Sequence, residues 1–232
     1  MILLVSPSRR AGIALRHIAA GLLVSLLALI AGCSSVSRGS VETIRLAFHR
    51  ARIDPTPASV AATPYFQLQV NAPTGEAILI LAKVEGGRLG WYGGQHDAVF
   101  TRDGLLVKTV GLPENLDGEL SSSASPFRTG LQHVIAPVEY TRRVDWSPGY
   151  RYGVELAARL EPRGVETITV LGEARRLLRF DERVTVMATG QHLENRYWVD
   201  PSDGFIWRSR QYVTPNFSLE LIALRPYRGA KP

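Results

Sequence analysis

The segment 192–222 reads HLENRYWVDPSDGFIWRSRQYVTPNFSLELI and decides the fold class, because it holds three strand-forming runs separated by turn residues. The runs His192–Val199, Phe205–Val213 and Phe217–Ile222 combine aromatic and aliphatic side chains that favour extended backbone. Asp200–Gly204 separates the first two runs and contains Asp, Pro, Ser and Gly, the residues that turns prefer. Short strands at this spacing predict an antiparallel sheet.

The same pattern extends upstream, and its clearest turn is Asp103-Gly104, a hairpin signal between two apolar runs. A second turn is expected at Glu161–Gly164, and Gly111–Gly130 is expected to be loop because it is rich in turn residues. Ala77–Ala82 is continuously apolar, which is typical of a strand covered on both faces. The expected upstream strands are Tyr65–Val70, Ala77–Ala82, Leu89–Tyr92, Val99–Thr101, Leu105–Val110, Val134–Asp145, Tyr150–Leu160, Val165–Phe180 and Arg183–Ala188.

The sequence therefore predicts a mainly β protein, with antiparallel sheets forming a sandwich or a partly open barrel. One short N-terminal helix is expected over Val41–Arg50, with Ser40 as its N-cap. Strands do not alternate with long helices, so a doubly wound α/β fold is disfavoured. We expect a single all-β domain over residues 41–228.

The first 40 residues have the pattern of a secreted, lipid-anchored protein. Residues 1–32 are expected to be a signal peptide: three arginines precede the apolar run Ile18–Ile30, and the small residues Ala31-Gly32 follow it. Ile30-Ala31-Gly32-Cys33 resembles the lipobox of bacterial lipoproteins. That resemblance implies that the chain is cut before Cys33 and that the Cys33 thiol is acylated. Residues 34–40 are small and polar, so residues 33–40 are expected to be a lipidated tether.

Lipidation predicts a location as well as an anchor. Several acyl chains hold a protein firmly to a membrane, because each buried CH₂ contributes about 0.8 kcal/mol. Ser34, rather than Asp, follows the lipidated cysteine, which favours the outer membrane over the inner membrane. We therefore expect a protein anchored in the outer membrane through Cys33 and facing the periplasm.

The charge of the chain indicates no nucleic-acid partner. The formal net charge is +6, but three of the 27 basic residues and none of the 21 acidic residues lie in the signal. The mature chain therefore carries only +3. It has no long basic run and no nucleic-acid-binding motif, and a periplasmic location disfavours nucleic acid.

No set of residues predicts catalysis or metal binding. The histidines lack the spacing of zinc ligands, Cys33 is the sole cysteine, and no G-x-S-x-G nucleophile motif occurs. Asp181 and Glu182 are adjacent, so in a strand their carboxylates point to opposite faces. We expect no enzyme activity, no metal and no cofactor.

Five aromatic residues are the candidate contacts to a glycan or to a protein partner: Trp91, Tyr92, Trp198, Trp207 and Tyr212. The alternative is that such residues fill the core and pair strands, which is their commonest role in β folds. Adjacent residues such as Tyr197 and Trp198 alternate faces, so only one of each such pair can line a given surface. Most of the five are expected in the core.

Several motifs occur together in an order that resembles one family. They are Asn195–Asp200, Gly204–Gln211, Pro215, Leu224–Pro226, Trp91-Tyr92 with Gln95, and Asp103–Leu112. The chain resembles the YjbF/GfcB family of outer-membrane lipoproteins from exopolysaccharide and group 4 capsule gene clusters, over about Val41–Pro226. Leu105 stands where the family usually has Arg after Gly104. The resemblance implies a partly open barrel and a role in polysaccharide production or export, and it brings no catalytic residues.

Three functions follow from these observations. The first is a non-enzymatic accessory lipoprotein for exopolysaccharide or capsule production or export, which would bind polysaccharide or other export proteins. The alternative is a carrier of lipid or acyl chains, with Ala77–Ala82 lining part of a cavity. A glycan-active enzyme is third, and it would need two carboxylates that converge in a cleft.

Overall fold

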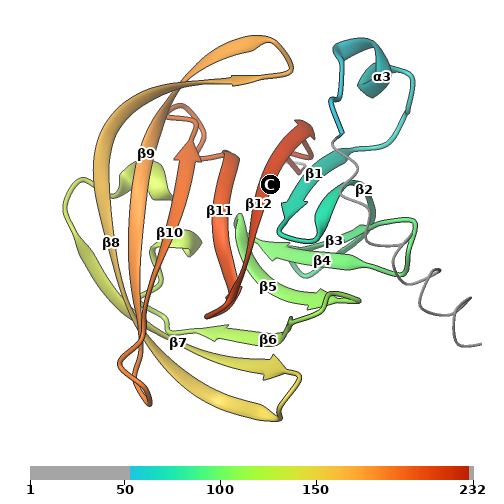
Figure 1. Ribbon diagram of the computed structural model, residues 1–232. Coiled ribbons are helices and arrows are strands. Elements are labelled where there is room, and N and C mark those ends of the chain that lie inside the picture. The colour runs from blue at the N-terminus through green and yellow to red at the C-terminus, as the bar shows by residue number, and fades with distance from the viewer. Residues whose placement is uncertain (1–52, 230–232) are drawn as a thin grey trace, which may run out of the picture. The chain divides into compact units, whose positions relative to one another are not determined.

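The computed structural model describes residues 53–229, which form one sheet of 12 antiparallel strands with very little helix (Figure 1). The signal, Cys33, the tether and the expected helix Val41–Arg50 all lie outside the described residues. None of the described helices is long and apolar enough to cross a membrane. The elements are α3 (Pro57–Ala61), β1 (Gln67–Ala72), β2 (Gly75–Glu85), β3 (Arg88–Tyr92), β4 (Ala98–Arg102), β5 (Leu105–Val110), β6 (Asn115–Ser121), η1 (Pro126–Arg128), η2 (Leu131–His133), β7 (Val138–Ser147), β8 (Arg151–Val170), β9 (Glu173–Val186), β10 (His192–Val199), β11 (Ile206–Thr214) and β12 (Phe217–Arg225).

The sheet curls into a nearly closed barrel. Its strand order is β5-β4-β3-β2-β1-β12-β11-β10-β9-β8-β7-β6, so the edge strands β5 and β6 are consecutive in the chain. The edges meet where the Leu116 backbone N–H donates to Thr109 Oγ1 at 2.9 Å. The prediction of a mainly β protein is therefore confirmed, and of the two predicted arrangements, a sandwich or a partly open barrel, the structure has the barrel.

The hairpin predicted at Asp103-Gly104 joins β4 to β5, and both residues have positive φ, 51° and 79°. A two-residue turn of this kind matches the twist of the flanking strands. Gly104 also lies against β11, because a Cβ there would sit 2.4 Å from Ile206 Cδ1. Glycine therefore satisfies both the turn geometry and the close approach of the two strands.

The prediction of a turn at Glu161–Gly164 is wrong. β8 continues through these residues as a strand of 20 residues, and its register with β9 shifts between Pro162 and Gly164. Pro and Gly here accommodate a β-bulge that bends the strand. The hairpin turn lies instead at Leu171-Gly172, with φ of 51° and 80°, so Val165–Phe180 is not one strand.

Two further expectations need correction. Gly111–Gly130 is not all loop, since β6 lies within it and pairs with β7. Ala77–Ala82 is not covered on both faces: Leu79 is buried, Ile78 and Ile80 are half-buried, and Ala82 is exposed. The outer side of β2 has no covering layer in the described part of the chain, so only its inward residue is fully enclosed.

The barrel interior holds the main core, and η1 and η2 contribute Phe127 and Leu131 to it. Phe127 packs edge-to-face against Tyr197, with ring centroids 5.0 Å apart. A second, smaller core lies outside the barrel, where the far half of the β8–β9 hairpin packs over β10–β12 (Figure 1). The residues of this outer core are Ile168, Val170, Leu177, Trp198, Trp207 and Ala223.

Candidate functional site

A polar network occupies the barrel interior and centres on Glu182 of β9, which is fully buried. Arg142 Nη2 of β7 lies 2.9 Å from Glu182 Oε1, and the Tyr140 hydroxyl donates to the same oxygen. Tyr197 Oη and Asn195 Nδ2 of β10 donate to Oε2 at 2.7 and 2.8 Å. Both carboxylate oxygens therefore have donors, as a buried charge requires.

The electrostatics of this network favour a charged Arg142 and protonated tyrosines. Burial alone would lower the pKa of Arg142, but Glu182, together with Tyr140, Tyr197 and Glu119, outweighs burial and holds that pKa above its usual value. Burial and the Glu182 charge together raise the pKa values of Tyr140 and Tyr197 well above normal, so both phenols stay protonated and donate. The network joins β7, β9 and β10 inside the barrel.

The space beside this network is small. A cavity of about 20 Å³, lined in part by Glu119, Arg142 and Tyr212, is close to the room that a single water molecule needs. Small-molecule pockets measure about 300–1,000 Å³. Burial raises the pKa of Glu119, but neither Glu119 nor Glu182 opens into a cleft of ligand size. The packed interior therefore has room for neither an acyl chain nor a sugar ring.

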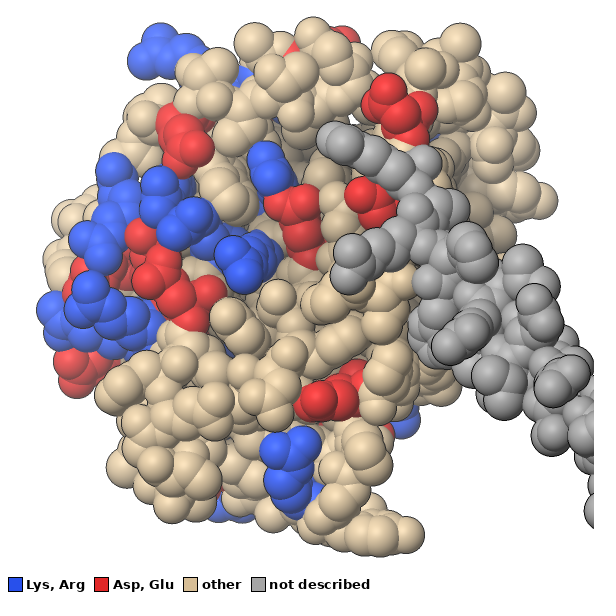
Figure 2. Space-filling model, viewed as in Figure 1, with Lys and Arg blue, Asp and Glu red and all other residues tan. Residues whose placement is uncertain are grey.

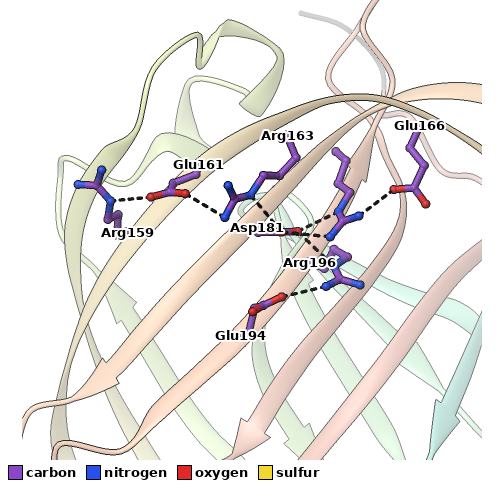
Figure 3. Close-up of polar contacts among 8 residues, drawn as sticks. Arg159, Glu161, Arg163, Glu166, Asp181, Glu194 and Arg196 are labelled. Carbon is purple, nitrogen blue, oxygen red and sulfur yellow. Dashed lines mark hydrogen bonds and ion pairs between the residues drawn. The ribbon is translucent and has the colours of Figure 1, made fainter.

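A second polar network covers the outer face of β8–β10 (Figure 3). Asp181, next to the inward Glu182, points outward as the alternation of a strand requires. Its carboxylate contacts Arg179 at 3.0 Å, Arg196 at 3.1 Å and Arg163 at 3.2 Å. Burial would raise the pKa of Asp181, but hydrogen bonds and charges from Arg179 and Arg196 hold it below its usual value.

The charges of this outer network nearly cancel. It contains four arginines and five carboxylates: Arg159, Arg163, Arg179, Arg196, Glu139, Glu161, Glu166, Asp181 and Glu194. Figure 2 shows blue and red side chains intermixed over these strands. Nearly balanced charges offer no strong field to an anionic or cationic partner, so we assign this network to strand pairing.

Trp198 and Trp207 lie together in the outer core, beneath the β8–β9 hairpin. Trp207 Nε1 donates to Asp200 Oδ2 at 3.2 Å, and the Arg175 guanidinium carbon lies 3.7 Å from the Trp207 ring centroid. Each indole is only 6% exposed, which leaves little ring surface free for a ligand.

Two open hollows flank the end of this hairpin. The larger, of about 390 Å³, lies between α3, the hairpin turn and the end of β12, with Val60, Val170 and Leu224 among its walls. The smaller, of about 280 Å³, has polar walls that include Asn71 and Glu76.

The other three candidate aromatics lie elsewhere. Trp91 points into the barrel and donates from Nε1 to Thr101 Oγ1 at 3.2 Å. Tyr212 is half-buried beside the interior cavity. Tyr92 is 38% exposed on the outside of β3, where its ring packs edge-to-face with Phe100. The structure thus brings Trp198 and Trp207 together but does not gather the five aromatics on one surface.

Sequence reasoning missed the interior network. The alternation rule correctly placed Asp181 and Glu182 on opposite faces, but it could not identify Arg142 as the partner, 40 positions earlier in the chain. The pattern Tyr140-x-Arg142 on β7 was the available signal, since it places two polar groups at alternate positions of one strand. Within residues 53–229, no three His, Cys, Asp or Glu side chains gather closely enough to bind a metal ion.

Comparisons with known proteins agree on one family. A family model described as group 4 capsule polysaccharide lipoprotein GfcB, YjbF matches residues 41–224. The uncharacterized lipoprotein GfcB of Escherichia coli (strain K12) is 27% identical over 210 residues, covering 88% of this chain and 98% of GfcB. The uncharacterized lipoprotein YjbF of the same strain is 28% identical over 158 residues, covering 67% of this chain and 71% of YjbF.

A solved structure shares the fold. The crystal structure of the hypothetical lipoprotein YmcC from Escherichia coli (K12) superposes with a TM-score of 0.68 and 24% sequence identity. The match covers 81% of this chain and 96% of that chain.

Proposed function

Because this chain belongs to the YjbF family of group 4 capsule polysaccharide lipoproteins, we propose that it is a non-enzymatic accessory protein for the production or export of exopolysaccharide or capsule. In this role the barrel acts through its outer surface, by contacting polysaccharide or other export proteins. The observation that carries the proposal is the family match over residues 41–224, which spans the whole barrel rather than a short motif.

The filled interior supports a role on the outer surface. The interior cavity of about 20 Å³ leaves no room for a sugar ring beside Glu119. A glycosidase needs two carboxylates that flank the scissile bond with substrate between them. Surface contact is therefore the activity that the geometry favours.

The proposed location follows from the N-terminal sequence. We propose that Cys33 carries the lipid and that the barrel faces the periplasm from the outer membrane. Placement at this membrane would concentrate the protein where polysaccharide leaves the cell.

A deletion strain tests the proposal. Secreted and surface polysaccharide would be measured in the deletion strain and in strains complemented with wild type or with Cys33→Ala. The proposal predicts less polysaccharide after deletion, restored by wild type and not by a Cys33→Ala protein present at equal abundance. Unchanged polysaccharide in the deletion strain would refute the accessory role.

A carrier of lipid or acyl chains is the second candidate, and the larger outer hollow is the observation that favours it. That hollow has aliphatic walls, including Val60, Val170 and Leu224, and its volume of about 390 Å³ is within the range of ligand sites. Extraction of the purified protein with organic solvent, followed by mass spectrometry, would detect stoichiometric lipid beyond the anchor if the carrier function holds. A Val170→Glu variant should then lose that lipid.

A further inference from the structure

The outward positions of β2–β5 form a surface that differs in charge from the rest of the barrel. We call it the cationic aromatic face and define it by Lys83, Arg88, Tyr92, Phe100, Arg102 and Lys108. Trp91 and Thr101, which alternate with these residues, point into the barrel. The face therefore includes Tyr92, one of the five candidate aromatics, but not its neighbour Trp91.

Two aromatic rings cover the middle of this face. Tyr92 and Phe100 meet edge-to-face, with ring centroids 5.8 Å apart and an interplanar angle of 78°. Gly90 lies beneath them, and a Cβ there would come within 3.1 Å of the Tyr92 ring and 3.2 Å of the Phe100 ring. The absence of a side chain at Gly90 lets both rings lie against the strands while their outer surfaces stay accessible.

Basic residues surround the two rings. Arg88 lies directly opposite Arg102 in the β3–β4 register, and Lys108 lies opposite Phe100 in the β4–β5 register. The Arg88 guanidinium also lies 5.6 Å from the Phe100 ring centroid. Like charges placed directly opposite each other in a sheet reduce its stability, so strand pairing alone does not account for Arg88 and Arg102.

The excess of positive charge is local. Glu85 is the single acidic residue at an outward strand position from Lys83 to Lys108, and hydrogen bonding and charge from Lys83, together with Arg88, lower its pKa. Asp103, in the turn after Arg102, also interacts with the Arg102 charge. The nearby Asp97 carboxylate accepts a hydrogen bond from the backbone of Gln95 in the β3–β4 turn. Of the 27 basic residues in the chain, 19 lie within 53–229, against 20 of the 21 acidic residues. A face with four basic residues and one acidic residue thus stands out on a domain that is nearly neutral.

We propose that the cationic aromatic face binds an acidic polysaccharide. The apolar CH faces of sugar rings would stack on Tyr92 and Phe100, and sugar carboxylates would pair with Arg88 and Arg102. This inference rests on the proposed function and adds to it a ligand class and a contact surface.

The geometry favours a glycan over a membrane surface. Phe100 lies in the middle of β4 and Tyr92 is the last residue of β3, and both rings pack against Gly90. Aromatic residues that insert into a bilayer must reach past the surrounding surface to the headgroup level. Rings that lie along the strands instead suit a polymer that lies along the sheet.

The test measures binding of the acylated full-length protein, held in neutral detergent micelles, to polygalacturonate as an acidic probe and to dextran as a neutral one. The test variant replaces Lys83, Arg88, Arg102 and Lys108 with Gln. The matched control replaces four exposed arginines elsewhere with Gln, namely Arg143, Arg176, Arg183 and Arg210. A separate Tyr92→Ala variant tests the stacking contribution.

We expect wild type and the control variant to bind polygalacturonate, with an affinity that falls as salt rises, and to bind dextran much more weakly. The test variant should bind polygalacturonate at least about fourfold more weakly, since each of four lost ion pairs weakens binding by about 1.4- to 5-fold. Tyr92→Ala should weaken binding with little change in its salt dependence.

Equal binding by the test and control variants would overturn the inference, as would failure of wild type to bind polygalacturonate. Binding of wild type to phosphatidylglycerol vesicles but not to polygalacturonate would assign the face to the membrane and also overturn it. In cells, a deletion that lowers polysaccharide but is fully complemented by the test variant would refute this inference alone. A silent deletion would refute the proposed function.

Discussion

Replacing Arg142 with Met should destabilise the barrel strongly, because it would leave the fully buried Glu182 carboxyl without its cationic partner. Glu182 would keep its donors Tyr140, Tyr197 and Asn195 but lose the guanidinium at 2.9 Å. Removing one partner of a buried ion pair typically costs about 3–5 kcal/mol of unfolding free energy. For a domain of this size, that loss corresponds to a fall in Tm of roughly 6–20 °C.

Urea unfolding, followed by tryptophan fluorescence, measures this loss directly. The matched control is Arg143→Met on the same strand, since Arg143 forms an exposed pair with Glu155. Exposed pairs contribute about 0–1 kcal/mol, so this control should change the midpoint only slightly.

A double variant separates the lost charge partner from lost packing. Arg142→Met combined with Glu182→Gln removes both charges, and it should recover much of the stability because replacing both members of a buried pair is often nearly neutral. If Arg142→Met unfolds at the same urea concentration as Arg143→Met, the ion pair contributes little and the reasoning fails. If the double variant is no more stable than Arg142→Met, packing rather than charge explains the loss.

Three other predictions concern other parts of the chain. Asp181→Asn should lower the free energy of unfolding by about 1–2 kcal/mol at neutral pH. Because the pKa of Asp181 is lowered in the folded state, the stability that Asp181 adds over Asn should be complete above about pH 4 and should disappear as the pH falls through the folded pKa. Urea titrations at several pH values would measure this difference. Gly104→Ala should lower the urea midpoint more than Gly86→Ala, since both residues have positive φ but only the Gly104 methyl would meet Ile206; equal midpoints would contradict the close approach. Cys33→Ala should abolish incorporation of labelled palmitate and move the protein to the soluble periplasmic fraction, whereas continued labelling would place the lipid elsewhere.

The sequence predicted the β architecture because strand composition and turn residues are local signals. Asp103-Gly104 marks a hairpin by itself, and the structure has the hairpin there. Glu161–Gly164 carries equally strong turn residues, yet β8 passes through them because pairing with β9 extends on both sides of the bulge. The outcome depended on long-range pairing, which no local pattern contains.

Contacts between distant segments limited the prediction of the site in the same way. Alternation correctly assigned Asp181 and Glu182 to opposite faces, but Arg142, Arg163 and Arg196, which pair with these carboxylates, come from other strands. The cationic aromatic face could not be predicted from the sequence for a similar reason, since Arg88 and Arg102 become neighbours only through strand register. A sequence shows which residues carry charge, whereas the register decides which charges meet.

The strand order also bears on how the chain folds. All 11 hydrogen-bonded pairings among the described strands join neighbours in sequence, except β1 with β12, which brings Asn71 beside Glu220. Hairpins between neighbours close small loops and form quickly, whereas the β1–β12 pairing must overcome the entropy of closing a loop that contains all the other strands. The first and last strands, β1 and β12, should therefore pair last. A circular permutant cut within 111–114 would leave all 11 pairings intact and turn this slowest closure into a local hairpin, so it should fold faster than the natural chain.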